Sequence, residues 1–453
     1  MQVLETRVAR WVVTKGLRFS SFPRYGSWQF FVISSRKRHS GLVCMAQKKS
    51  AKGRQKVATQ QDSSSSHQDV QAPVPENAVL IDGSILEGGG QILRNSAALS
   101  AIMRTPISVE KIRAGRSKPG LRPQHLAGLR LLEALSGGRL SGGIESSKSI
   151  VLEPAALQCG AFEGNTGTAG SCTLLAQAAL PCLLFASPTK GQDMSVVDLR
   201  GGTDAAMAPP VGYLQQILLP TLRRLFNIDI TEKLERRGFF PKGGGRMSLE
   251  VRCLPPGGKL PAFTLTRSGD VTSININAFS AGKLRGGQAG KLSIVDRLAD
   301  SAAAVLKQSL GRDVDIRTEF TEETEESAFG DGVGMLLVAT TSEGCVLGAA
   351  AIGERGKSSE QLGEAAAQEL VEDIYAGGCV DRWLQDQLII FMALADGESS
   401  MTCSEPTLHT RTAMVIAEKL TGAKFTVRRP APRSQEPWTI SCEGVGIAAG
   451  ELG

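Results

Sequence analysis

The sequence predicts an α/β (α+β) protein: a large domain of three repeated α/β units, each with two helices on a four-stranded sheet, plus a small inserted α/β domain. Two observations predict this fold class. The order strand, helix, strand, helix, strand, strand recurs in the apolar pattern of the chain. A stretch with its own pattern of elements interrupts the third recurrence. The order of elements repeats but the residues do not, which favours related α/β units over a solenoid.

The first unit begins with a short apolar strand near Val79 and a glycine-rich turn at residues 87–90. Leucines recur at helical spacing in the second helix, which gives that helix one apolar face. The predicted elements that follow the turn are a helix over 91–103, a strand over 107–112, a helix over 123–135, and strands near 139–141 and 150–152.

The second unit repeats this order, and the third repeats it with an interruption. For the second unit we predict a helix over 171–185, a strand over 195–199, a helix over 211–226, and strands over 228–234 and 246–251. For the third unit we predict a first strand over 271–278, then after the interruption a helix over 380–395, a strand over 401–404, a helix over 410–420, and strands over 424–428 and 438–442.

The interruption has the length and pattern of a small domain. Its predicted elements are a helix over 290–310, a strand over 314–320, a hairpin over 334–350 and a helix over 360–375. The predicted domains are therefore a targeting segment and linker over 1–76, the large domain over 77–281 and 378–453, and the inserted domain over 282–377.

The N-terminal region is rich in Arg, Lys and Ser, and Glu5 is its one acidic residue before about residue 56. This is the composition of an organellar transit peptide, which predicts a plastid or mitochondrial location. Residues 48–75 read as a Gln-, Ser- and Pro-rich linker. Three alternatives stay open: a disordered basic arm that touches nucleic acid, a mispredicted start of the sequence, and nuclear residence with residues 36–38 or 48–49 as basic signals.

Composition excludes several other classes of protein. No run approaches eighteen apolar residues, so no membrane span is predicted. The nine cysteines form no CxxC pair, which argues against a zinc ribbon or a disulfide framework. The net charge of +6 arises largely before residue 60. A site for a polyanion therefore needs a local cluster of Arg and Lys.

His409 is the first candidate for chemistry. The chain has four histidines, and only His125 and His409 lie outside the N-terminal region. Thr407 is a suitable N-cap, so His409 falls in the first turn of a helix. The positive end of the helix dipole disfavours an imidazolium there and favours a neutral ring that attacks a phosphate. The alternative is a polar residue on an exposed first turn.

A basic loop over 112–125 is the second candidate. It places four cations between a strand and a helix, and Gln124 and His125 follow at the start of that helix. A phosphorylated chain end needs such a cluster, although a solvated basic loop is the alternative. Residues 87–90 suggest close approach of the backbone to a ligand. No Walker A loop occurs, so a tight turn is the alternative.

A third group gathers at the start of the helix over 380–395. Trp383 has a face that stacks on a base, and Asp386 is placed to orient an imidazole or bind a ribose. For Trp383, packing in the core is the alternative.

Taken together, these segments resemble the RNA 3′-terminal phosphate cyclases. The similarity is carried, in family order, by residues 82–94, 112–125, 168–172, 237–245 and 408–410, and it extends from about Val79 to Gly446. The three-unit body with an inserted domain is also the fold that this resemblance implies.

The resemblance implies a ligase-type reaction that depends on ATP and a divalent metal, Mg²⁺ or Mn²⁺. A histidine at the position of His409 attacks the α-phosphate of ATP and becomes a covalent histidine–AMP. AMP then passes to an RNA 3′-phosphate, and the neighbouring 2′-OH expels it to leave a 2′,3′-cyclic phosphate. The implied partner is RNA with a 3′-phosphate end, with no membrane and no obligate protein partner.

The resemblance also implies roles for particular residues. Trp383 stands where relatives often carry Tyr, which keeps the stacking face and loses a hydroxyl. A sister branch of the family is a non-catalytic factor in ribosomal RNA processing and lacks the nucleophile, so His409 favours the catalytic branch. The adenylate pocket comprises Gln177, Pro209, Trp383, Asp386, Gln387 and His409; the RNA phosphate site comprises Arg94, Arg113, Arg116, Gln124 and His125; and the metal ligand is Glu87.

Overall fold

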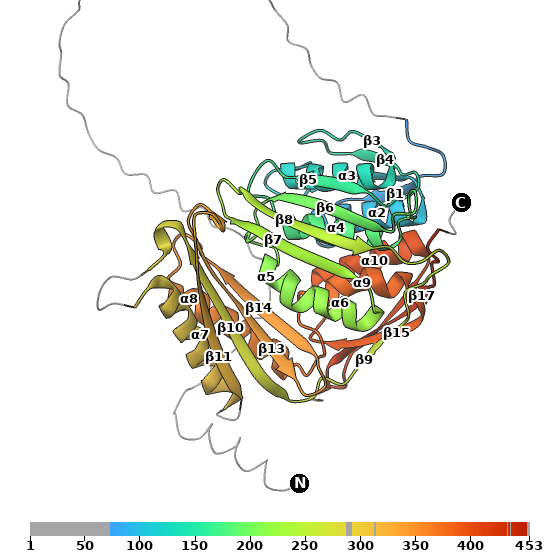
Figure 1. Ribbon diagram of the computed structural model, residues 1–453. Helices are drawn as coiled ribbons and strands as arrows, with labels where there is room; N and C mark the ends of the chain where they lie inside the picture. Colours follow the sequence, from blue (N-terminus) through green and yellow to red (C-terminus); the bar gives the residue numbers. More distant parts are fainter. Residues whose placement is uncertain (1–72, 287–291, 312–313, 433, 435, 451–453) are drawn as a thin grey trace, which may run out of the picture. The chain divides into compact units, whose positions relative to one another are not determined.

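The computed structural model describes residues 73–286, 292–311, 314–432, 434 and 436–450. The predictions made for the transit peptide and for most of the linker lie outside these residues. The described residues form one compact unit, in which four sheets pack with helices. Figure 1 follows them in sequence order, from blue through green to red.

The first unit has the predicted order of elements. Strands β1 and β2 are parallel, and the other pairs in the sheet are antiparallel, with the spatial order β1-β2-β4-β3. The elements are β1 (Val79–Asp82), α2 (Gly90–Met103), β2 (Ile107–Glu110), α3 (Pro123–Ser136), β3 (Arg139–Ser141) and β4 (Ile150–Glu153).

The second unit has the same topology, in the order β5-β6-β8-β7, with a fifth strand at the edge. That strand, β12 (Ala328–Phe329), comes from the interrupting segment and pairs with β7. The first strand of the unit, β5, was not predicted. The elements are β5 (Ala161–Asn165), α4 (Cys172–Leu184), β6 (Met194–Gly201), a continuous helix of α5 (Val211–Tyr213), η1 (Leu214–Leu218) and α6 (Leu219–Phe226), β7 (Ile230–Gly238) and β8 (Gly245–Arg252).

The third unit repeats the topology once more, in the order β9-β15-β17-β16. Its first strand is the two-residue β9, which pairs in parallel with β15. The placement of strand 271–278 at the head of this unit was therefore wrong. The elements are β9 (Thr264–Leu265), α9 (Leu384–Leu394), β15 (Asp396–Cys403), α10 (Leu408–Thr421), β16 (Lys424–Arg428) and β17 (Trp438–Val445).

The strand near 271 belongs to the sheet of the interrupting segment instead. It is β10 (Val271–Ala281), and it lies between β11 and β13 in the order β11-β10-β13-β14. Helices α7 and α8 pack against each other and against this sheet. The predicted domain boundaries at 282 and 377 stay predictions. The remaining elements are η2 (Gly282–Leu284), α7 (Ile294–Leu310), β11 (Asp315–Glu323), β13 (Gly332–Thr341), β14 (Val346–Ile352) and α8 (Ser359–Tyr375).

One hydrophobic core joins the three units. Helix α10 packs on α2 and α9, and α4 packs on α2, α3 and α9. Leu99, Leu175 and Leu388, from α2, α4 and α9, are fully or almost fully buried in it. This packing brings the N-terminal turns of helices from different units together. Among the described helices, none combines the length and apolar character that a membrane crossing needs.

Candidate active site

His409 lies in the first turn of α10, as predicted. Thr407 caps the helix, its hydroxyl accepting the backbone N–H of Thr410 at 3.1 Å. The Nδ1 atom of His409 lies 2.8 Å from Oε1 of Gln91, in the first turn of α2. The side chain of His409 is exposed as a whole, although its Nδ1 edge meets the buried Gln91.

Asp386 determines which atom of Gln91 faces the imidazole. The Nε2 amide of Gln91 donates to Oδ2 of Asp386 at 2.6 Å, so Oε1 points towards His409. An amide oxygen only accepts hydrogen bonds, so Nδ1 of His409 carries the proton. The lone pair of the ring is then on Nε2, which is the nitrogen available to attack an electrophile.

The charges around this chain of three residues favour a neutral imidazole. Partial burial lowers the pKa of His409, and Arg94 and Arg116 lower it further against the opposing effect of Glu87. Burial raises the pKa of Asp386 to about 7, although Arg94 opposes that rise. Burial also lowers the pKa of Arg94, which stands between the charges of Asp386 and Glu87.

Glu87 has one carboxylate oxygen free for a ligand. Arg116 forms an ion pair with Oε1 and donates to the backbone carbonyl of Glu87 at 3.1 Å. The other oxygen, Oε2, is buried and has no hydrogen-bond partner among the described residues. A buried carboxylate oxygen suits Mg²⁺ or Mn²⁺, which often binds one or two carboxylates plus phosphate oxygens. In the described part of the chain, no three His, Cys, Asp or Glu side chains group as a metal site, so phosphates would have to complete the shell.

His125 and Gln124 lie in the first turn of α3, and the ring of His125 lies against Gly90 at the start of α2. The backbone N–H of Arg122 donates to Nδ1 of His125 at 3.2 Å, and burial with nearby arginines lowers the pKa of His125 to about 3. An alanine Cβ at Gly90 would lie 2.6 Å from Nε2 of His125, so only glycine fits between helix and ring. Gln124 Oε1 accepts the backbone N–H of Ser171 at 2.8 Å, which ties the first unit to the second.

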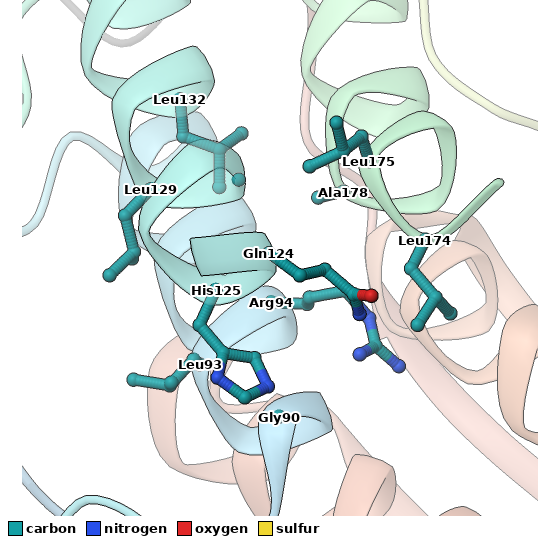
Figure 2. Close-up of a pocket in the computed structure, with 11 residues that line it drawn as sticks. Gly90, Leu93, Arg94, Gln124, His125, Leu129, Leu132, Leu174, Leu175 and Ala178 are labelled. Carbon is teal, nitrogen blue, oxygen red and sulfur yellow. The ribbon is translucent and has the colours of Figure 1, made fainter. Parts of the chain in front are cut away.

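A small pocket, partly open to solvent, lies between α2, α3 and α4. Figure 2 shows Arg94, Gln124 and His125 near Gly90 at one end of it, while leucines of α3 and α4 line the rest. The surface of the pocket is almost wholly apolar, so its polar residues contribute little of the exposed wall.

Arg113 occupies the basic loop with positive φ (53°). Its Nη1 donates to the backbone carbonyls of Lys118 at 2.7 Å and Gly120 at 3.1 Å, so it holds the loop closed. Burial, Arg116 and Arg122 together lower its pKa. Crowded cations of this kind are relieved by an anionic ligand.

The predicted adenylate residues meet between α4 and the start of α9. Gln177 donates from Nε2 to Oε1 of Gln387 at 2.9 Å, and Gln387 donates to the carbonyl of Trp383 at 2.7 Å. One turn earlier on α4, Thr173 donates to the carbonyl of Pro209 at 2.7 Å. The predicted site residues therefore lie around the N-terminal ends of α2, α3, α9 and α10 and along one face of α4.

Gln91 was missed as a site residue, although it lies inside the glycine-rich motif. The sequence does contain a signal for Gln91, because it directly follows the glycine turn. A buried amide in the first turn of a helix needs hydrogen-bond partners for both its oxygen and its nitrogen. The sequence does not say that those partners are Asp386 and His409.

The sequence is similar to one family of known proteins. The sequence model of the RNA 3′-terminal phosphate cyclase family matches residues 85–427. The chain is 38% identical over 371 residues to the RNA 3′-terminal phosphate cyclase of Drosophila melanogaster, covering 82% of this chain and 98% of that one. It is 37% identical over 381 residues to a probable RNA 3′-terminal phosphate cyclase of Dictyostelium discoideum, with 82% and 84% covered. For the RNA 3′-terminal phosphate cyclase of Pyrobaculum aerophilum the identity is 36% over 370 residues, with 82% and 99% covered.

Three α/β units of one topology, interrupted by a segment with a sheet of its own, define a class of repeated α/β proteins. Within that class, this chain belongs to the RNA 3′-terminal phosphate cyclase family.

Proposed function

We propose that this protein is a catalytic cyclase, which uses ATP to convert an RNA 3′-phosphate into a 2′,3′-cyclic phosphate. The observation that carries the proposal is the chain Asp386–Gln91–His409, which leaves the Nε2 lone pair of His409 free. The names of the relatives support the cyclase activity, and the geometry supports a histidine nucleophile.

In the first step Nε2 of His409 forms a bond to the α-phosphorus of ATP. The bond from that phosphorus to the oxygen bridging to the β-phosphate breaks, and pyrophosphate leaves. The ring becomes cationic and keeps its proton on Nδ1, which donates to Oε1 of Gln91. The amide of Gln91 in turn donates to the Asp386 carboxylate. Gln91 thus passes the stabilising effect of a negative charge to the ring without a proton transfer.

In the second step an oxygen of the RNA 3′-phosphate bonds to the phosphorus of AMP as the P–N bond to His409 breaks. A 3′-phosphate has no good leaving group, and the attached AMP supplies one. In the third step the neighbouring 2′-OH attacks the 3′-phosphorus, gives up its proton and expels AMP. The ring closure is intramolecular, so proximity supplies much of its rate.

The basic residues and their polar neighbours suit the phosphate of the RNA terminus. Arg94, Gln124 and His125 lie together near Gly90. Arg116 bonds Glu87, and Arg113 lies near both of them. A divalent metal held by Glu87 would neutralise charge on the triphosphate.

The test is covalent labelling with ATP labelled at the α-phosphate, in the presence of Mg²⁺ or Mn²⁺. We expect an acid-labile, alkali-stable label, as for a phosphoramidate, and no label in the His409→Ala or His409→Asn protein. Absence of label in the wild type at all metal and ATP concentrations would contradict the proposal and favour the non-catalytic role in ribosomal RNA processing.

A further inference from the structure

The start of α9 is held by the interrupting segment at three consecutive residues. We propose that this segment is part of the nucleotide site, and that Glu369 on α8 is a positioning residue for ATP acting through Trp383. The inference rests on the proposed function and deepens it, because it assigns to the inserted domain control over the affinity for ATP.

Trp383 is the first of the contacts. Its indole N–H donates to Oε1 of Glu369 at 2.7 Å, and its ring packs partly buried against the core. A buried indole N–H needs an acceptor, and that acceptor fixes the plane of the ring. Because Trp383 is the proposed stacking surface for adenine, Glu369 fixes the plane of the ring on which the base stacks.

Asp381 is the second contact, and it is fully buried. Its carboxylate accepts the backbone N–H groups of Trp383 and Leu384 at 2.8 Å each, which are free amides at the start of α9. It also accepts the hydroxyl of Tyr213 and the backbone N–H of Gly348, both at 2.7 Å. One side chain thus joins α9, the second unit, and strand β14 of the interrupting segment.

Arg382, between these two residues, makes the third contact. Its Nε donates to Oδ2 of Asp373 at 3.0 Å, and one Nη donates to Glu372 at 3.1 Å and to the carbonyl of Glu369 at 3.2 Å. All of these acceptors lie on α8. The side chain of Asp373 is almost wholly buried, so this pair is held firmly.

The three contacts also control the position of site residues in the first turn of α9. Asp386, which orients Gln91 and through it His409, lies in the first turn of this helix. Gln387 bonds back to the carbonyl of Trp383. A shift of α8 therefore moves the base-stacking ring and the start of α9 together.

The experiment compares three variants of the full chain. Glu369→Leu removes the acceptor at similar volume, and Glu369→Gln keeps an oxygen that can accept the indole N–H. Glu364→Leu is the matched control, because Glu364 is exposed on the same helix and makes no side-chain contact with the start of α9 among the described residues. The rate of AMP transfer to His409 is measured against ATP concentration, with GTP as competitor.

We expect Glu369→Leu to raise KM for ATP about tenfold with kcat within about twofold, in line with a lost hydrogen bond to a charged group. GTP should also compete better. Glu369→Gln should restore KM to within about threefold of wild type, and Glu364→Leu should leave it unchanged. An unchanged KM in Glu369→Leu overturns the inference, as does failure of Glu369→Gln to rescue.

Two further measurements keep the result decisive. In a Trp383→Phe background, which has no indole N–H, adding Glu369→Leu should change KM no further; an additional increase overturns the link through Trp383. In a His409→Ala background, calorimetric titration with ATP gives Kd without any AMP transfer. A Kd that depends on Glu369 supports the inference even if the wild type takes no label, whereas a Kd independent of Glu369 overturns it.

Discussion

The Nε2 amide of Gln91 donates to Oδ2 of Asp386 at 2.6 Å, across 295 positions of the chain. The bond joins the first turn of α2, in the first unit, to the first turn of α9, in the third. It also determines which nitrogen of His409 carries a proton.

The first prediction concerns Gln91. Gln91→Leu removes the acceptor for Nδ1 of His409 and leaves the Asp386 carboxylate without that donor. We expect AMP transfer to fall about 100-fold at saturating ATP, as for loss of a residue that orients a catalytic group. Single-turnover labelling measures it. Gln368→Leu, at an exposed position on α8, is the control and should label at the wild-type rate.

The second prediction concerns pH. The raised pKa of Asp386, about 7, means that its carboxylate takes up a proton as pH falls through 7. The charged form stabilises the cationic ring, so AMP transfer should be full above pH 8 and decline below 7. The lowered pKa of His409 places loss of its nucleophilic form at still lower pH. In Asp386→Asn the rate should be lower throughout and the decline near pH 7 should vanish. A decline that persists there in the variant assigns it to another group.

The third prediction concerns Gly90. A Cβ at this position would lie 2.6 Å from Nε2 and 2.8 Å from Cδ2 of His125. Gly90→Ala should therefore displace the ring and lower the free energy of unfolding by about 1–3 kcal/mol. Gly115→Ala is the control, because a Cβ there meets no atom within 4 Å. Urea unfolding of both variants gives the comparison, and equal stabilities would contradict the prediction.

The fourth prediction separates the two phosphate sites. Arg113→Ala and Arg116→Ala should each reduce cyclisation of a 3′-phosphate RNA at least tenfold, since a hydrogen bond to a charged group contributes about 1.5–3 kcal/mol. AMP transfer to His409 should fall much less. Arg139→Ala, which removes an exposed pair with Glu153, should affect neither step. If wild-type protein binds a 3′-OH RNA as tightly as a 3′-phosphate RNA, a dedicated phosphate site is excluded.

The fifth prediction concerns the N-terminal region, which lies outside the described residues. We propose that residues 1 to about 46 direct the protein to a plastid or mitochondrion. Fluorescence from a reporter fused to the first 75 residues should be organellar. Nuclear or diffuse fluorescence would contradict organellar targeting. A fusion in which the Arg and Lys residues before position 40 are replaced by Gln is the control and should lose the location.

The order of elements could be predicted because each long element has its own apolar period. The exceptions are short or lie at edges. Strand β5 alternates in burial, but its inward residues are the half-buried Phe162 and the buried Gly164, so its residue types show no clear apolar period; β9 has two residues. Strand β10 was predicted as a strand but assigned to the wrong sheet. Local pattern shows that a segment is extended and half-buried, and it does not show which strand the segment pairs with.

The candidate site could be predicted by residue type and, through the family resemblance, by position. His409 at a capped helix start and the cations of the basic loop both have local signals. The partners of these residues do not, because Gln91 and His409 are 318 positions apart. The contact between Glu369 and Trp383 was missed for a different reason: both lie close in sequence, but in elements that the sequence assigns to separate domains.

Strand β9 has a consequence for the order in which the chain acquires its structure. It pairs with β15 across the whole interrupting segment, and Phe263 bonds Ser399 at a separation of 136 residues. Closing an unstructured loop of that length costs roughly 4 kcal/mol of chain entropy, which two paired residues recover poorly. If the interrupting segment folds first, its own sheet and helices bring the two ends together and most of that cost is removed. During synthesis the third unit would then be completed last, after the interrupting segment has folded and brought β9 close to β15.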